Sequence, residues 1–416
     1  MTSPIPKPHA NHLPLRAKVP GFRDDALLHL VAKDMTTSRL THFDAKTYVR
    51  AGCNFATQDY LGLAGHPALR AAALAALGQH RLGAPGSATL LGLTAPVVAL
   101  EARIGRFLDL TAIAFPSGTE ALRTTLATLL QPGDDVIVDA GAHPAVFETV
   151  RAVQAKLHCS PTGSLKGIER RLSRIARQLR KGRVFMVVSA VSAHGSEVAD
   201  LTELAQLARG FGATLIADLS HDLGSIGRDG GGVMDVQNCR GCVDVAIGSF
   251  AKTFGAAGGF AAFRDPAFKD RLRQSQWRTA ALSPVNASAI MAALDLVEGP
   301  EGRRRRLRLH ANALRLRNHL MADGLHPVGR TSPFVILRLP PLTALPRTAL
   351  LESAGPIVTL LQAPVVAAHT PRWRIQLSAD HGVADIDDLA ELIRDVSRAF
   401  DRQPRALRQI QPVDQS

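Results

Sequence analysis

Cysteine is scarce in this chain, with four among 416 residues: Cys53, Cys159, Cys239 and Cys242. The last two form a lone Cys-x-x-Cys pair without a second pair or histidines at ligand spacing, so we expect no metal or redox site there. The chain also lacks a run of ~20 apolar residues, which a membrane span needs. Its first residues carry prolines and charges and no long apolar stretch. The sequence therefore predicts a cytoplasmic protein without a membrane span.

Acidic residues are outnumbered, 36 to 49, which gives a formal net charge of +13. Part of the excess lies in two basic runs, residues 166–183 and 303–308. Such a run is typical of a nucleic-acid site, of attraction for an anionic substrate such as coenzyme A or an acidic carrier protein, or of a solvated helix face. In the first run Ile168, Leu172 and Ile175 recur at helical spacing, so one side packs and the basic side faces water. We favour the solvated face and expect no nucleic-acid partner, although the pattern does not choose among the three.

Changes of pattern near residues 55 and 285 divide the chain into three parts: an N-terminal arm and small segment (1–54), a large domain (55–285) and a small C-terminal domain (286–416). In the first part we expect a loose Pro-rich arm over 1–20, then a helix and a short exposed strand within 21–50. In the last part, a long helix over 286–322, strands at 333–338 and 373–377 and a helix over 385–400 predict an α+β domain.

The middle part alternates short apolar runs with helical segments. The runs lie at 112–115, 135–138, 184–188, 214–217, 243–247 and 260–263, and the helices at 119–130, 144–153, 166–180 and 201–210. This alternation predicts an α/β domain with a mainly parallel sheet covered on both faces. Ligand sites of such sheets lie at the carboxyl ends of the strands, where the polar and glycine-bearing turns of this chain fall.

Lys252 follows one apolar strand directly and precedes a glycine-rich turn, in Gly248-Ser-Phe-Ala-Lys-Thr-Phe-Gly-Ala-Ala-Gly-Gly259. A lysine in such a place often has a lowered pKa and serves as a nucleophile or Schiff-base amine, although a lysine pointing to solvent gives the same pattern. Asp218 ends another strand, with His221 three residues later. A carboxylate there either stabilises the protonated ring nitrogen of a cofactor or caps the next turn.

Two more strand ends carry candidate ligand residues. Ser117, Gly118 and Thr119 open a helix, where free N–H groups and the helix dipole favour a phosphate. A plain helix cap explains the same residues. His143, followed by a proline suited to a first helical turn, is either a residue that stacks on a planar cofactor or a surface histidine.

The order and spacing of these motifs together resemble those of the α-oxoamine synthases, a group of fold type I enzymes that use pyridoxal 5'-phosphate (PLP). The resemblance covers roughly residues 54–395, from Gln58-Asp-Tyr-Leu-Gly62 to Arg372-Trp-Arg-Ile-Gln-Leu-Ser378. It implies an α/β fold with a PLP-binding large domain, built on a mainly parallel seven-stranded sheet flanked by helices, and a smaller C-terminal α+β domain.

The resemblance also implies a role for each matching residue. Lys252 holds PLP as a Schiff base and moves the substrate proton, Asp218 pairs with the pyridinium nitrogen, His221 contacts the phenolic oxygen and His143 stacks on the ring. The phosphate is expected at Ser117, Gly118, Thr119 and Ser249. No metal is implied.

On the substrate side, the resemblance assigns the amino-acid carboxylate to Arg374, a task that suits a guanidinium, with Gln58 beside it. The family's active site lies at a homodimer interface, so Thr279 is expected to reach the phosphate of a neighbouring subunit. The implied reaction is a decarboxylative condensation of a small amino acid with an acyl thioester, from acyl-CoA or an acyl carrier protein, to an α-aminoketone. Another PLP reaction on this fold, an aldolase or lyase, and a non-catalytic partner subunit are the alternatives.

Several positions depart from the family pattern. Gln58 replaces an asparagine, Ala193 a serine that faces the cofactor, Thr89 an arginine, and Val365 a threonine. The usual aromatic residue after Ser-Gly is Thr119. Because these changes cluster around the expected substrate and not around Lys252, they indicate a divergent member with an unusual substrate. The sequence does not name the amino acid or the acyl chain.

Overall fold

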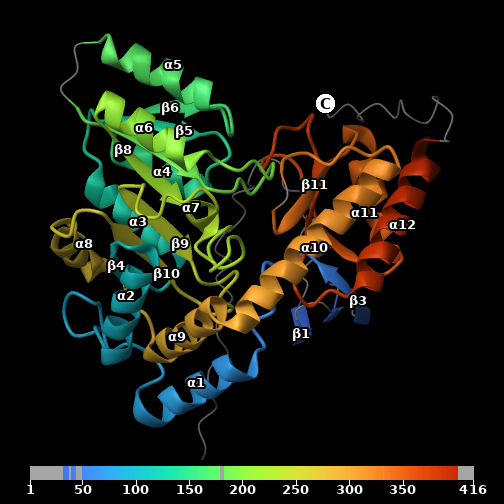
Figure 1. The fold of residues 1–416 in the computed structure, drawn as a ribbon, viewed down its shortest axis with the longest axis horizontal. Coiled ribbons are helices and arrows are strands. Elements are labelled where there is room, and N and C mark those ends of the chain that lie inside the picture. The colour runs from blue at the N-terminus through green and yellow to red at the C-terminus, as the bar shows by residue number, and fades with distance from the viewer. Residues whose placement is uncertain (1–30, 37–38, 44–48, 179–181, 331, 402–416) are drawn as a thin grey trace, which may run out of the picture.

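A seven-stranded sheet organises the larger part of the computed structural model, which describes residues 31–36, 39–43, 49–178, 182–330 and 332–401 (Figure 1). Its order is β4-β10-β9-β8-β7-β5-β6. The strands are β4 (Thr111–Phe115), β5 (Asp135–Asp139), β6 (Lys156–Ser160), β7 (Val184–Ser189), β8 (Ala213–Asp218), β9 (Val245–Ser249) and β10 (Gly259–Phe263). β10 is antiparallel to both of its neighbours, and the remaining pairs are parallel. The predicted mainly parallel sheet is thus confirmed. The sequence did not predict β6, a polar strand at the sheet edge.

Helices cover both faces of this sheet because successive strand residues alternate between two apolar cores. Ile113 and Phe115 pack in the core that α3 and α4 share, whereas Ala112 and Ala114 belong to the core on the opposite face. The helices of this part are α1 (Pro67–Gln79), α2 (Ala95–Leu108), α3 (Gly118–Leu129), α4 (Pro144–Ala152), α5 (Leu165–Ala176), α6 (Leu201–Phe211), α7 (Gly232–Val236) and α8 (Phe268–Ser275). The four helices predicted in the middle part all form, within a few residues of their expected ends.

A second sheet, of six strands, joins the two ends of the chain in the order β1-β2-β3-β12-β13-β11. It consists of β1 (Val31–Thr36), β2 (Arg39–Phe43), β3 (Val49–Phe55), β11 (Phe334–Arg338), β12 (Ile357–Leu361) and β13 (Arg372–Gln376). β3 runs parallel to β12, with Asn54 opposite Ile357. For residues 21–50 a helix and then a short exposed strand were expected; the part of this range that the structure describes forms β1, β2 and the start of β3, and residues 21–30 lie outside the described residues. The expected arm over 1–20 lies outside the described residues, and the three-part division of the chain stays a prediction.

Two helices replace the single long one expected over 286–322: α9 (Pro284–Glu298) and α10 (Pro300–Ala322). Gly299 is extended, and Pro300 lacks the N–H that would continue α9. A Cβ at Gly302 would lie 2.4 Å from the Leu296 carbonyl oxygen, so the close crossing of the two helices needs glycine there. The sequence also missed β12 and α11 (Ala344–Ser353), whereas α12 (Val383–Asp401) matches its prediction.

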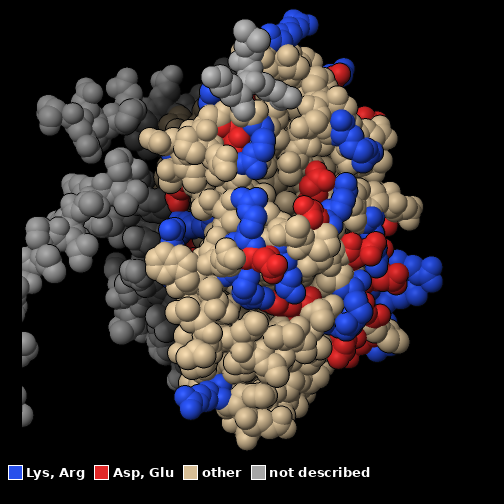
Figure 2. All heavy atoms as spheres, turned by 90° about the vertical axis from the view of Figure 1, so that its left-hand side faces the viewer, with Lys and Arg blue, Asp and Glu red and all other residues tan. Residues whose placement is uncertain are grey.

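The first basic run behaves as the solvated face that its spacing predicted. On α5, Ile168, Leu172 and Ile175 are buried while Arg170 and Arg174 are exposed. The face of the molecule in Figure 2 carries basic and acidic side chains interspersed among uncharged ones, without one continuous basic field. Over the described part of the chain, no helix has both the length and the apolar character that crossing a membrane requires.

Candidate active site

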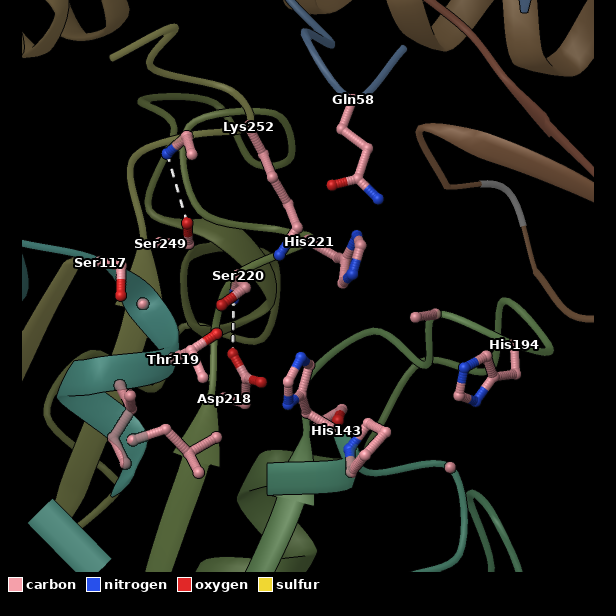
Figure 3. Close-up of a pocket in the computed structure, with 18 of the residues that line it drawn as sticks. Gln58, Ser117, Thr119, His143, His194, Asp218, Ser220, His221, Ser249 and Lys252 are labelled. Carbon is pink, nitrogen blue, oxygen red and sulfur yellow. Dashed lines mark hydrogen bonds between the residues drawn. The ribbon is translucent and has the colours of Figure 1, made fainter. Parts of the chain in front are cut away.

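A cavity of about 440 Å³ lies at the carboxyl ends of the parallel strands, where the sheet topology predicts a ligand site. It is lined by Gln58, Ser117, Gly118, Thr119, Leu122, Gly141, His143, Pro144, Ser189, Ala193, His194, Asp218, Ser220, His221, Ile247, Ser249, Ala251, Lys252, Val365 and Arg374. Segments far apart in the sequence therefore meet here, as Figure 3 shows for the labelled side chains. Ten of the eleven site residues predicted from the sequence belong to this set.

Lys252 enters the cavity from the turn that follows β9, and its half-buried side-chain amine has no hydrogen-bond partner among the described residues. Gly255 shapes this turn with a φ of +64°, and a Cβ there would lie 2.4 Å from the Ala64 backbone nitrogen. Burial lowers the pKa of Lys252; the Asp218 carboxylate opposes this shift, and the Arg374 guanidinium adds to it. The amine is therefore easier to deprotonate than a solvated lysine, as a nucleophile requires.

Asp218 and His221 face the cavity from the end of β8 and the turn after it (Figure 3). Asp218 accepts a hydrogen bond from the Ser220 backbone N–H at 2.9 Å, which fixes the carboxylate. The His221 ring lies with Nδ1 2.8 Å from the Tyr60 hydroxyl oxygen. Burial and then Lys252 lower the pKa of His221 well below its usual range, while burial raises that of Tyr60. Both groups are therefore neutral near pH 7, and they can share one hydrogen bond.

The N-terminus of α3 opens onto the cavity beside the turn that carries Lys252. Ser117 caps this helix, its Oγ accepting from the Glu120 N–H at 3.1 Å. A Cβ on Gly118 would lie 2.7 Å from the Ser249 Cβ, so only glycine allows the helix start to approach the end of β9 this closely. Ser249 in turn accepts from the Ala251 N–H at 3.2 Å. Free helical N–H groups and two hydroxyl side chains thus surround one corner of the cavity, an arrangement suited to a phosphate.

His143 caps α4 on the opposite side of the cavity. Its Nδ1 accepts from the Ala145 N–H at 3.2 Å, which fixes the ring orientation and leaves Nε2 to carry the proton of the neutral ring. Enclosure by the cavity walls lowers the pKa of His143, although Asp218 acts against this. The turn before it is held by the buried Asp139, which accepts from the N–H groups of Gly141 at 2.7 Å and Gly163 at 2.9 Å.

Arg374 reaches the cavity from β13, so the second sheet supplies part of the site. Its guanidinium donates to the Ala193 carbonyl oxygen at 3.4 Å, while its buried Nε has no partner within the described structure. His194 also lines this side, and burial together with Arg374 and Arg372 lowers its pKa to about 4. Gln58 lines the same cavity, its side chain pointing toward His221 in the view of Figure 3. A carboxylate entering here would meet one cation and two neutral hydrogen-bonding groups.

Three residues of interest lie elsewhere. Thr279, the eleventh predicted site residue, does not line the cavity of its own chain. Thr89 donates to the Arg273 carbonyl oxygen at 2.6 Å, also away from it. Ser192 is buried at 3% exposure beside Ala193 and does not line the cavity, so it does not take the place of the missing serine.

The sequence missed Tyr60, Ser220 and His194 as parts of the site. Tyr60 lies in the quoted Gln58–Gly62 motif, but its contact with His221 spans 161 residues and has no local signal. His194 directly follows Ala193 and has no local signal of a site. Its approach to Arg374 depends on the second sheet.

The donor set suits PLP. The amine of Lys252, which has no partner, suits the aldehyde of that cofactor, and the carboxylate of Asp218 suits its ring nitrogen. The start of α3, where Gly118 leaves no room for a Cβ, suits its phosphate. By contrast, no group of three or more His, Cys, Asp or Glu side chains among the described residues could hold a metal ion.

Comparison with known proteins agrees with this geometry. The family model of class I and II aminotransferases matches residues 51–393. An 8-amino-7-oxononanoate synthase of Acidithiobacillus ferrooxidans is 34% identical over 353 residues, covering 82% of this chain and 87% of that protein. One from Bordetella petrii is 31% identical over 348 residues, with shares of 82% and 87%.

Solved structures confirm the fold. A serine palmitoyltransferase from S. paucimobilis with a bound PLP–myriocin aldimine superposes with a TM-score of 0.81 at 24% identity, covering 89% of this chain and 93% of that one. An 8-amino-7-oxononanoate synthase from Francisella tularensis gives 0.72 at 21% identity, with shares of 84% and 99%.

Proposed function

This chain belongs to the aminotransferase class I and II family and, within it, to the PLP-dependent α-oxoamine synthases, and from that premise we propose that its cavity joins a small amino acid to an acyl thioester. One observation carries the proposal. Lys252, Asp218 and the start of α3 line the same cavity as Arg374, so a PLP site and a carboxylate site adjoin. The relatives named as synthases favour this reaction over an aldolase or lyase.

The residues divide the work between cofactor and substrate. The N–H groups at Gly118 and Thr119 with the hydroxyls of Ser117 and Ser249 hold the phosphate, and Asp218 holds a proton on the ring nitrogen. Bound PLP then supplies an electron sink for a negative charge at the substrate Cα. His143 would lie against the ring of PLP, and His221, held by Tyr60, would contact its phenolic oxygen.

Lys252 and Arg374 act on the amino acid. Arg374 orients the substrate through its carboxylate, with the Gln58 amide in reach of the same group. Lys252, as a neutral amine, removes the Cα proton, and its lowered pKa suits that transfer. A bond then forms between Cα and the acyl carbon as the thiol leaves, and the carboxylate departs as carbon dioxide, its site taken by a proton. The product is an α-aminoketone.

Thiol release tests this proposal. PLP-loaded protein is mixed with glycine, alanine or serine and an acyl-CoA series, and free coenzyme A is followed with a thiol reagent. We expect release that depends on both substrates, and a loss of more than a thousandfold in Lys252→Ala, because the covalent link and the proton acceptor disappear together. Lys166→Ala, on the exposed face of α5, serves as the matched control.

The outcomes separate the alternatives. Release with an acyl carrier protein but not with coenzyme A identifies the donor. Amino-acid breakdown without thiol release contradicts the condensation and favours a lyase. Absence of a ~420 nm Schiff-base band at saturating PLP contradicts the cofactor assignment and favours a partner subunit.

A homodimer is part of the proposal, supported by one surface. Leu82, Leu90 and Leu91 are 73%, 74% and 82% exposed, an unusual concentration of large apolar side chains. The segment that carries them lies beside residues 273–283: the Ala281 N–H donates to the Gly86 carbonyl oxygen at 3.0 Å. Thr279 belongs to this adjoining segment, so a second subunit that covers the leucines would bring it near the neighbouring phosphate site.

Light scattering of the protein and of Leu90→Asp with Leu91→Asp tests the dimer. We expect twice the chain mass for the parent and a shift to the monomer in the double variant, because each aspartate would have to be buried at the interface. Leu345→Asp, at a site 50% exposed on α11, is the control. A parent of single-chain mass contradicts the dimer.

A cytoplasmic location completes the proposal. Amino acids and acyl thioesters are metabolites of that compartment, and none of the four cysteines, all of which lie among the described residues, forms a disulfide, as is usual in a reducing compartment. Cell fractionation checks it.

A further inference from the structure

A second cavity, of about 480 Å³, lies between α10 and the loop that follows His221. Its charged lining is cationic: Arg228, Arg303 and Arg306 contribute to it, and no aspartate or glutamate does; His310, Ser225 and Ser332 are its other polar residues. Part of the second basic run, residues 303–308, thus lines a cavity. The reaction described above makes no use of this cavity.

Arg306 forms the buried side of this cavity, with 5% of its surface exposed. Its guanidinium donates to the carbonyl oxygens of Val297 at 2.6 Å and Arg228 at 2.7 Å, and its Nε has no partner within the described structure. None of the ion pairs between described residues includes it: the carboxylates of Asp229 and Asp235 act on its charge only from beyond ion-pair distance, and Asp235 pairs with Arg240 at 2.8 Å. A buried cation without a counter-ion in contact is costly, and an anion in the cavity would offset that cost.

The rim of the cavity combines free charges with apolar surface. Arg303 and Arg228 are exposed and make no ion pair with a described residue. Their neighbour Arg305 differs, since it pairs with Glu301 at 3.0 Å and Asp380 at 2.9 Å and so has a structural task. Beside the two free arginines, Leu307 is 64% exposed.

We propose that this second cavity binds an organic phosphate, a phosphate monoester attached to an apolar group. Two unpaired guanidinium groups on the rim match the paired oxygens of a phosphate, and the buried charge of Arg306 attracts it from below. The apolar part of the ligand would cover Leu307, Val236 and Ile226, which line the same cavity.

The loop between the two cavities gives the site a route to the reaction. His221 lines the first cavity, whereas Ser225 and Ile226 line the second. Ser225 donates from its Oγ to the His221 carbonyl oxygen at 3.2 Å. A ligand in the second cavity therefore contacts the same short loop that positions His221.

Calorimetric titration of the PLP-saturated protein with octyl phosphate tests the site, with inorganic phosphate and octyl glucoside as partial probes. We expect one saturable site for octyl phosphate and at least tenfold weaker binding of the other two compounds, because inorganic phosphate lacks the apolar chain and octyl glucoside lacks the phosphate. Arg303→Gln and Arg228→Gln should each weaken the binding of octyl phosphate by about tenfold or more, because each removes a charge-assisted hydrogen bond.

Arg304→Gln is the matched control, an exposed arginine of the same helix that does not line the cavity. Its affinity should stay within twofold of the parent. Equal losses for Arg303→Gln and Arg304→Gln would reduce the effect to general attraction by a basic helix and overturn the site. Binding no tighter than that of octyl glucoside, or none at all, would overturn it as well. Because calorimetry reads binding alone, this result is independent of thiol release.

Discussion

Two opposite charges, those of Asp218 and Arg374, act on Lys252 and help to set the pH at which its amine is neutral and able to react. Its pKa is lowered from 10.5 by burial, raised again by Asp218 and lowered further by Arg374. Only the neutral amine attacks the aldehyde of PLP, so the rate of capture should rise with pH and level off below 10.5.

The pH dependence of this capture rate has its inflection at the pKa of Lys252, and two charge-removing variants should move that inflection in opposite directions. Asp218→Asn removes the charge that stabilises the ammonium, so the inflection moves to lower pH. Arg374→Gln removes a repelling charge and moves it to higher pH. Stopped-flow measurement of the ~420 nm band after mixing PLP-free protein with PLP reports the inflection. Asp109→Asn is the control, an exposed residue with a φ of 57°, which asparagine tolerates. Shifts of the same sign in both variants would contradict this electrostatic account.

The start of α3 depends at the element scale on Gly118. Alanine there would place its Cβ 2.7 Å from the Ser249 Cβ, so the helix start or the end of β9 must move. We expect Gly118→Ala to weaken PLP binding by about tenfold or more, because the phosphate would lose aligned N–H donors of about 1.5–3 kcal/mol each. Equilibrium dialysis against PLP measures the loss.

Gly78→Ala is the matched control for that variant. Gly78 lies inside α1, and a Cβ there meets nothing within 4 Å. The control should keep PLP affinity and gain roughly 0.5–1 kcal/mol of stability, since glycine is costly in a helix interior. Unchanged PLP affinity in Gly118→Ala would exclude the close approach as a condition for the phosphate site.

The whole molecule is held together by contacts that link its two ends, and His381 makes one of them sensitive to acid. This buried ring accepts at Nδ1 from the Ser378 N–H at 3.0 Å, and its Nε2 lies 3.0 Å from the Asn54 carbonyl oxygen. Only the neutral ring fits both partners. Burial accordingly lowers its pKa to about 4, from 6.5.

A pKa lowered on folding means that the unfolded chain binds more protons between pH 6.5 and 4. The stability contributed by neutral His381 is therefore complete above 6.5 and lost as the pH falls toward 4, at up to about 1.4 kcal/mol per pH unit. His194 acts in the same direction. Asp222, whose pKa burial raises to about 8, acts oppositely, because its stabilising proton is lost as the pH rises.

Comparison of variants isolates the His381 contribution from these others. Urea unfolding at pH 7 and at pH 5 should give a smaller difference in free energy for His381→Asn than for the parent chain. The expected change is about 1–2 kcal/mol, from the linkage between pKa and stability. Equal differences for the two proteins would mean that His381 is not held neutral. Asp109→Asn again serves as the control.

The sequence by itself determined the local features of this protein. The strands and helices around Ser117, His143, Asp218 and Lys252 follow from apolar period, caps and glycine turns, which act over a few residues. Because parallel strands must point their carboxyl ends to one edge, that order also placed these residues in one site. Their chemistry, with the resemblance to a family, then indicated PLP.

Tertiary structure decided what depends on contacts between distant segments. The pairing of β3 with β12 and the contact of residues 82–91 with residues 273–283 have no local signal. Neither does the contact of Tyr60 with His221, or the burial of Arg306 within a run that looked uniformly solvated. Each depends on where the backbone brings two remote segments together, and the free energy that holds such segments in place comes from the whole packed core. The break between α9 and α10 at Gly299-Pro300 has a local signal, since glycine and proline both end helices. The hydrophobic periodicity continues across these two residues, which is why the sequence predicted a single helix.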